Sequence, residues 1–141
     1  MPTKAQYREL EHTGDLAIEV TAPSREELLA QALIALARLM VEEEGIDTRE
    51  QREITVPSDS DADVIRDLLA AALNLFLIDG FIWRSAAVST RDGGTTVASL
   101  SGEIFDRRRH QLIGEIKAVT YHGLTVEETA SGWRAVVVFD A

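Results

Sequence analysis

The sequence predicts an α+β fold in which two helices pack on a largely antiparallel or mixed sheet. Three observations favour this class. Two stretches of helical length have apolar residues at helical spacing, and each follows a run that contains capping residues. The other apolar runs are shorter, as strands are, and turn residues separate them. Two of those turns contain glycine and can join antiparallel neighbours, so the last part of the chain should be mostly sheet.

Two short strands are expected at the start of the fold. They span 7–10 and 16–21 and flank the segment His12-Thr-Gly-Asp15. Because the chain must turn between them, His12 and Asp15 should lie at strand ends, where polar side chains can reach solvent or a ligand.

The first helix should start after Ser24 and run to about Glu43. Ser24-Arg-Glu-Glu27 matches a capping box, in which the serine hydroxyl and the glutamate carboxylate bond reciprocally to end amides. Gly45 lies just beyond, where a left-handed residue can end a helix. One apolar face of this helix comprises Leu29, Leu33, Leu36 and Met40.

A brief strand at 53–57 should lead into the second helix. The run Ser58-Asp-Ser-Asp61 offers several capping side chains, and the helix is expected from about Ala62 to Ile78. Gly80 should stop it. Its buried stripe comprises Val64, Leu68, Ala72 and Leu75, with Asp79 at the end.

The remaining chain should consist of strands. Segments 81–90 and 95–104 form a hairpin, with Asp92-Gly93-Gly94 supplying the positive φ of its turn. Three further strands are expected, and the turn Ser131-Gly132 joins the last two: 115–120, 123–129 and 133–140. With no repeat, linker or low-complexity stretch, residues 1–141 should form a single domain.

Composition excludes several classes of function. A net charge of −10 argues against direct gripping of nucleic acid, which needs Lys and Arg to neutralise phosphates. The one basic run, Arg107-Arg108-Arg109-His110, fits either a solvated loop or a docking patch for a partner or RNA. The absence of Cys excludes disulfides and thiolate ligands. No apolar run approaches the ~20 residues of a membrane span, and the first residues do not resemble a signal peptide, so a cytoplasmic protein is expected.

Common catalytic motifs are missing as well. The chain has no phosphate loop, no dinucleotide fingerprint, no His-Glu-x-x-His pair and no Gly-x-Ser-x-Gly. Only three His are present, which weakens the case for zinc, whereas carboxylates are abundant and favour Ca²⁺ or Mg²⁺.

Two carboxylates, Asp15 and Asp140, are the candidates for such a site. Each has an ordinary alternative, because Asp15 can accept amides in a turn and Asp140 can be a solvated strand end. If the two ends of the chain meet, these carboxylates and that of the last residue, Ala141, would repel one another unless a cation intervened. Of the other polar residues, Lys117 either points outward from a strand or contacts a phosphate or a partner carboxylate.

Five blocks together resemble the archease family, over essentially the whole chain. The most specific is Lys117-Ala-Val-Thr-Tyr-His122, and the His-Thr-x-Asp turn is moderately specific. The blocks occur in the order and at the spacing of the family: Glu11 to Asp15, Asp67 to Leu69 with Leu73 to Phe76, Glu103 to His110, Lys117 to His122, and Phe139 to Ala141.

The resemblance implies a protein cofactor without catalytic residues of its own. Archeases assist the RtcB-type RNA-splicing ligase of tRNA splicing and RNA repair, promoting its guanylylation by GTP and its repeated turnover. RNA would be reached only through the ligase, and no membrane is involved. The family's metal site, carried over, comprises Asp15, Asp140 and Ala141, the last through main-chain or terminal oxygens, if the chain ends there. Ca²⁺ is the favoured ion, ahead of Mg²⁺ and Mn²⁺.

Supporting roles are expected for His12, which would hold the turn, and for Lys117 or His122, which would touch the partner or the nucleotide. Two departures from the family are Gly14, where alanine is usual, and Ala141, where a larger aliphatic residue is common. Two other functions remain open. One is a metal-dependent phosphoester hydrolase that uses Asp15 and Asp140 with His12 or His110 as base. The other is a general chaperone or scaffold that binds basic surfaces.

Overall fold

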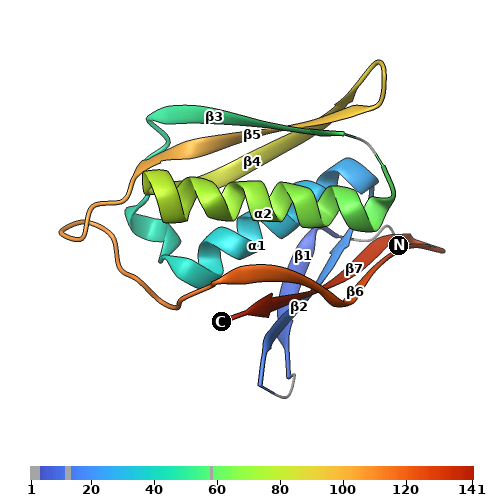
Figure 1. The fold of residues 1–141 in the computed structure, drawn as a ribbon, viewed down its shortest axis with the longest axis horizontal. Helices are drawn as coiled ribbons and strands as arrows, with labels where there is room; N and C mark the ends of the chain where they lie inside the picture. Colours follow the sequence, from blue (N-terminus) through green and yellow to red (C-terminus); the bar gives the residue numbers. More distant parts are fainter. Residues whose placement is uncertain (1–3, 12–13, 58) are drawn as a thin grey trace.

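The two helices lie between two antiparallel sheets (Figure 1). The structure is a computed structural model that describes residues 4–11, 14–57 and 59–141. One sheet has the strand order β1-β2-β7-β6 and the other has the order β3-β5-β4. The elements are β1 (Gln6–Leu10), β2 (Leu16–Ala22), α1 (Arg25–Met40), a 3₁₀ turn η1 (Glu43–Gly45), β3 (Glu50–Pro57), α2 (Asp61–Asp79), β4 (Phe81–Arg91), β5 (Thr95–Ile104), β6 (Ala118–Thr129) and β7 (Gly132–Asp140).

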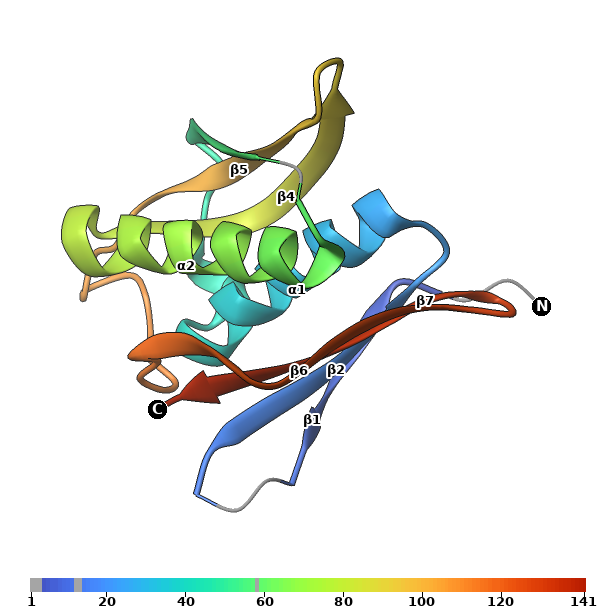
Figure 2. The same ribbon diagram turned by 45° about the vertical axis from the view of Figure 1, so that its right-hand side comes forward.

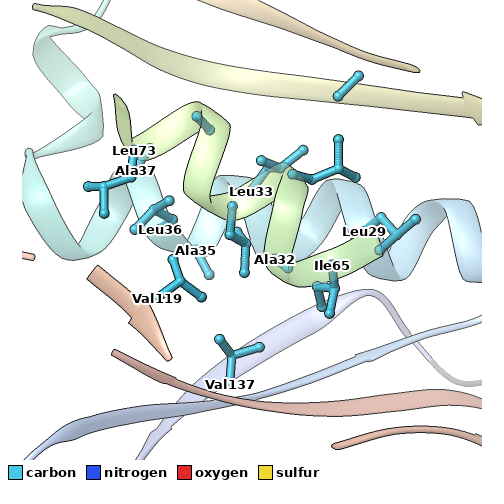
Figure 3. Close-up of a cluster of buried hydrophobic side chains, with 14 of the residues drawn as sticks. Leu29, Ala32, Leu33, Ala35, Leu36, Ala37, Ile65, Leu73, Val119 and Val137 are labelled. Carbon is cyan, nitrogen blue, oxygen red and sulfur yellow. The ribbon is translucent and has the colours of Figure 1, made fainter. Parts of the chain in front are cut away.

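The predicted α+β class is confirmed, and the strands divide into one sheet on each side of the helix layer. The division follows from the width of the apolar surface of α1. Besides the expected face, Leu28, Ala32, Ala35 and Leu39 are buried, so two sides of the helix need cover. Each sheet supplies one cover, and Figure 3 shows part of the core where the helices meet each other and the strands β6 and β7.

Trp83 connects the three-stranded sheet to the helix layer. Its side chain is fully buried on β4, and its indole N–H donates to the Leu33 carbonyl of α1 over 2.7 Å. Burial of this large ring is therefore combined with a satisfied donor, as a buried indole requires. No helix within the described ranges is long and apolar enough to cross a membrane.

The helix starts agree with the predicted capping residues. The Ser24 hydroxyl accepts the Glu27 amide over 3.2 Å at the start of α1, and Ser60 does the same for Asp63 at the start of α2. Gly80 ends α2 at φ +74°, as expected.

The predicted end of the first helix was wrong. The last residue of α1 is Met40, and Gly45 lies in η1 rather than in a left-handed cap. Val41 turns into extended backbone and forms a β-bridge with Leu112, so a strand-like contact replaces the last helical turn. This long-range partner leaves no signal in the local sequence.

The two strands expected at 115–120 and 123–129 are one strand, β6. Its register against β7 shifts between Thr120 and Thr125, and Gly123 in this bulge has φ +74°. The bulge turns the Tyr121 side chain toward α2, where its hydroxyl donates to Asp63 Oδ1 over 3.1 Å. The sequence predicts a break between two strands at the polar residues Tyr121 and His122. These residues instead lie in a bulge within a single strand.

Candidate functional site

Strand register brings Asp15 and Asp140 to the same end of the four-stranded sheet. Leu16 of β2 faces Phe139 of β7, so the residues next to this pair are Asp15 and Asp140. Asp15 directly precedes β2 and Asp140 is the last residue of β7, so each adjoins this terminal pair. Both aspartates are exposed. Figure 2 shows the end of β7, marked C, beside the first residues of β2.

Lys117 reaches the same place from the other side of β7. Its amide donates to the Asp140 carbonyl over 2.7 Å, and the next residue, Ala118, faces Asp140 in the register. The Lys117 side chain is exposed. Three segments that are remote in sequence therefore meet at one edge: the start of β2, the start of β6 and the end of β7. We call Asp15, Lys117, Asp140 and Ala141 the acidic edge.

The other two predicted site residues differ from these. His122 lies in the β6 bulge, further along the strand than the pairing of Ala118 with Asp140. It is exposed, and its amide donates to Thr120 Oγ1 over 2.7 Å. His12 lies outside the described residues, so its role in holding the turn stays a prediction.

Gly14, one of the two departures from the family, has φ +77°. Among the described residues other than its chain neighbour, no heavy atom lies within 4 Å of the place where its Cβ would be. An alanine would adopt this left-handed backbone only with strain. The turn that leads into Asp15 therefore uses the conformational freedom of glycine.

The donor set of the acidic edge fits a hard cation such as Ca²⁺ or Mg²⁺. Its donors are the two aspartate carboxylates and the oxygens of Ala141, and all of them are oxygen. Among the described residues, no three His, Cys, Asp or Glu side chains cluster closely enough to hold a metal ion. A cation here would thus be completed by Ala141 and water rather than by a third acidic side chain.

A second charged cluster, which the sequence interpretation missed, surrounds the buried side chain of Glu103 at the end of β5. Its Oε2 accepts the Asp47 amide over 2.6 Å and lies 3.0 Å from His110 Nε2. Its Oε1 accepts a short hydrogen bond from Arg109 and lies 3.8 Å from Arg49 Nε. We call Asp47, Arg49, Glu103, Arg109 and His110 the buried ion network.

The electrostatics of Glu103 follow from these bonds. Burial alone would raise the pKa of the carboxyl group. The Asp47 amide, Arg109 and His110 outweigh that effect and lower the pKa of Glu103 to about 2. The carboxylate is therefore ionised at any physiological pH.

His110 has both ring nitrogens engaged. Nδ1 accepts the Asp106 amide over 2.8 Å, so the proton lies on Nε2 and is donated to Glu103. With its side chain fully buried in this way, His110 cannot serve as a base at the acidic edge. The hydrolase alternative loses one of its two candidate bases.

The basic run is thus divided in its roles. Arg109 and His110 face inward to Glu103, whereas Arg107 and Arg108 are exposed. The sequence predicts either a solvated loop or a docking patch for this run. Neither alternative included two side chains that face inward. One signal could have indicated it: Glu103 is an acid in an otherwise uncharged strand, six residues before Arg109.

Three comparisons place the chain among known proteins. The model of the Archease protein family matches residues 7–141. A protein archease from Methanosarcina barkeri is 32% identical over 139 residues, which cover 96% of this chain and 95% of the relative. Another from Methanopyrus kandleri is 32% identical over 95% of this chain and 98% of the relative.

The fold also matches a solved structure. The solution structure of Methanobacterium thermoautotrophicum protein 1598 superposes with a TM-score of 0.79 at 19% identity. The match covers 96% of this chain and 98% of that one, so the likeness of fold extends over nearly the whole of both.

Proposed function

This chain belongs to the archease family, and on that premise we propose that it is a non-catalytic protein cofactor in RNA processing, which activates an RtcB-type RNA-splicing ligase. The ligase would use GTP to form its covalent guanylate, and this protein would promote that step and allow multiple turnover. The RNA would be bound by the ligase, in keeping with the net charge of −10 on this chain.

The observation that best supports the proposal is the meeting of Asp15 and Asp140 at one sheet edge. Like charges close together repel one another, and a divalent cation between them would remove the repulsion. Asp15, Asp140 and the oxygens of Ala141 would hold Ca²⁺, or alternatively Mg²⁺ or Mn²⁺. The bound ion would supply positive charge that a partner or its nucleotide can share.

The other residues of the edge would orient the partner. The exposed Lys117 ammonium group can reach a phosphate or a carboxylate of the ligase, while its backbone stays fixed by the bond to Asp140. His122, exposed on the bulge of the same strand, offers a second polar contact.

The test is multiple-turnover ligation by a purified RtcB-type ligase from the same source, with substoichiometric ligase, GTP and divalent metal. We expect stimulation by the wild-type protein and its loss in Asp140→Asn. The matched control is Glu128→Gln, which changes an exposed carboxylate near the opposite end of β6 and should stimulate fully.

Full stimulation by Asp140→Asn would exclude the proposed role of the metal site. No stimulation by the wild-type protein, with the ligase itself active, would exclude the cofactor function. Turnover of a phosphoester by this protein alone would favour the hydrolase instead.

A further inference from the structure

The segment 105–117, between β5 and β6, forms an ordered surface without helix or strand, apart from the bridge of Leu112 to Val41. Connections of this length without secondary structure are usually functional or disordered. This one is fixed by backbone hydrogen bonds at its start, middle and end. The bonds are Phe105 N to Gly80 O (2.7 Å), Ile113 N to Met40 O (2.8 Å), Glu42 N to Gln111 O (2.9 Å) and Lys117 N to Asp140 O (2.7 Å).

Exposed apolar side chains gather around this segment. Leu112 and Ile113 within it are 58% and 56% exposed, and Leu77 and Ile78 in the last turn of α2 are 51% and 77% exposed. Ile104, the last residue of β5, is 46% exposed. Figure 1 shows that the end of α2, the end of β5 and the segment lie together at one end of the molecule. Several exposed apolar side chains at one end of a molecule are typical of an interaction site.

A groove runs through this surface. A hollow of ≈ 260 Å³ lies between α2 and the segment and includes Phe76, Leu77, Ile116 and Glu115 in its lining. A second hollow includes Arg107 in its lining. Both hollows share the side chains of Phe105 and Leu112, so they adjoin, with Arg107 toward one end and Glu115 toward the other.

The groove is preformed, because its wall is supported by the buried ion network. The Phe105 ring packs edge-on against Phe76, with centroids 5.9 Å apart, and lies 5.5 Å from the His110 ring. His110 is in turn held by Glu103. A rigid apolar wall lowers the entropic cost of binding a partner.

The charge beside the groove indicates the chemistry of the occupant. Within the described part of the chain, the exposed side chains of Arg107 and Arg108 make no ion pair, although the protein has an excess of acidic residues. The neighbouring Arg109, by contrast, binds Glu103. Arg107 lines the groove and Arg108 follows it in the chain, so these two unpaired cations match an apolar segment that has carboxylates at one end.

We propose that this groove docks an apolar segment of the partner ligase, with acidic residues of that segment against Arg107 and Arg108. A protein segment fits better than RNA, because the lining is mostly apolar and Glu115 at the far end would repel a phosphate chain. The proposal rests on the proposed function for the identity of the partner. It adds an anchoring surface, because Ile116 in the groove is two residues from Ala118, which faces Asp140. A segment bound there would hold the ligase beside the acidic edge.

The test measures the affinity of the purified ligase for this protein by titration calorimetry. Arg107→Glu and Leu112→Ser each change an exposed side chain, so both variants should fold, and thermal unfolding checks this. We expect each to weaken binding about tenfold. Arg91→Glu is the matched control for charge, since Arg91 is an exposed arginine on β4, and it should bind as the wild type does.

The outcomes separate this proposal from the proposed function. Groove variants that bind the ligase with wild-type affinity would overturn the docking site, even if the wild-type protein stimulates ligation. Wild-type binding that falls in both groove variants would establish the site, even if ligation is not stimulated. Failure of the wild-type protein to bind the ligase, or binding of fluorescent RNA alone that Arg107→Glu abolishes, would overturn the protein occupant.

Discussion

The buried ion network and the acidic edge both contain carboxylates, but these carboxylates differ in their exposure to solvent and in their partners. The Glu103 side chain is only 5% exposed and is bonded to a backbone amide, an arginine and a histidine of the same chain. At the acidic edge, the strand register brings two exposed aspartates together, and the nearby cation, Lys117, is exposed as well.

The difference separates a structural role from the proposed functional one. A buried carboxylate without partners is costly, so the network of Glu103 is what the fold needs in order to close β5 against residues 47 and 105–110. The two aspartates of the acidic edge are exposed, so no cost of burial has to be offset there. Their cost is small, and a ligand from outside can offset it.

The largest effect that would sharpen this comparison is expected from Glu103→Ala. Removing one partner of a buried ion pair leaves its hydrogen-bond donors unsatisfied, so the free energy of unfolding should fall by about 3 kcal/mol. Glu53→Ala is the control, because that side chain is 55% exposed and pairs with Arg91 on the surface, and should cost less than about 1 kcal/mol. Urea unfolding at neutral pH measures both. Equal losses would mean that the network is not the structural element inferred here.

The second prediction concerns acid unfolding. The pKa of Glu103 is about 2 in the folded protein and near 4.5 when the chain is unfolded. A lowered pKa means that the stabilisation is complete above pH 4.5 and is lost as the pH falls toward 2. The unfolding free energy of the wild type should therefore decrease more steeply over this range than that of Glu103→Gln. Glu19, whose pKa is also lowered by its hydrogen bond to Arg8, is present in both proteins and does not contribute to the difference. Parallel pH curves for the two proteins would contradict the prediction.

The helices and hairpins were predictable because their signals are local. Ser24 and Ser60 begin the helices and Gly80 ends the second one, as capping chemistry requires. The end of α1 was not predictable, because it depends on the bridge of Val41 to a residue far along the chain. The continuity of β6 was not predictable either. The division of the strands into two sheets is likewise a result of tertiary packing.

The candidate site was predictable only in part. The placement of Asp15 near Asp140 required the register of β2 against β7, and the sequence offered it only as a condition, that the two ends of the chain meet. The inward role of Arg109 and His110 was missed, since a run of basic residues at a turn has the composition of a solvated loop. Burial of a single glutamate reverses that interpretation, and burial depends on the whole fold.

A smaller effect is expected at the acidic edge from Asp140→Asn. Without added metal, the unfolding free energy should stay within about 0.5 kcal/mol of the wild type, because the side chain is exposed. Free Ca²⁺ at ten times its dissociation constant should stabilise the wild type by about 1.4 kcal/mol and leave the variant unchanged. Thermal unfolding in Ca²⁺ and in chelator tests this. An equal rise in both proteins would place the ion elsewhere.

The smallest effect on stability is expected from Tyr121→Phe, which removes the hydrogen bond between the β6 bulge and α2. The hydroxyl of Tyr121 donates to Asp63, which raises the pKa of the phenol, and Arg66 lies 5.0 Å from the ring centroid. Because Tyr121 is 54% exposed, water can replace the lost bond, and the melting temperature should change little.

Hydrogen exchange in the bulge should respond more strongly than the melting temperature, since the hydrogen bond from Tyr121 to Asp63 joins the bulge to α2. We expect faster hydrogen exchange at the amides of His122 and Gly123, with exchange at Trp83 unchanged. If exchange in the bulge is the same in both proteins, the backbone of β6 alone sets its shape. In that case the position of His122 relative to the acidic edge depends on strand pairing, and α2 has no part in it.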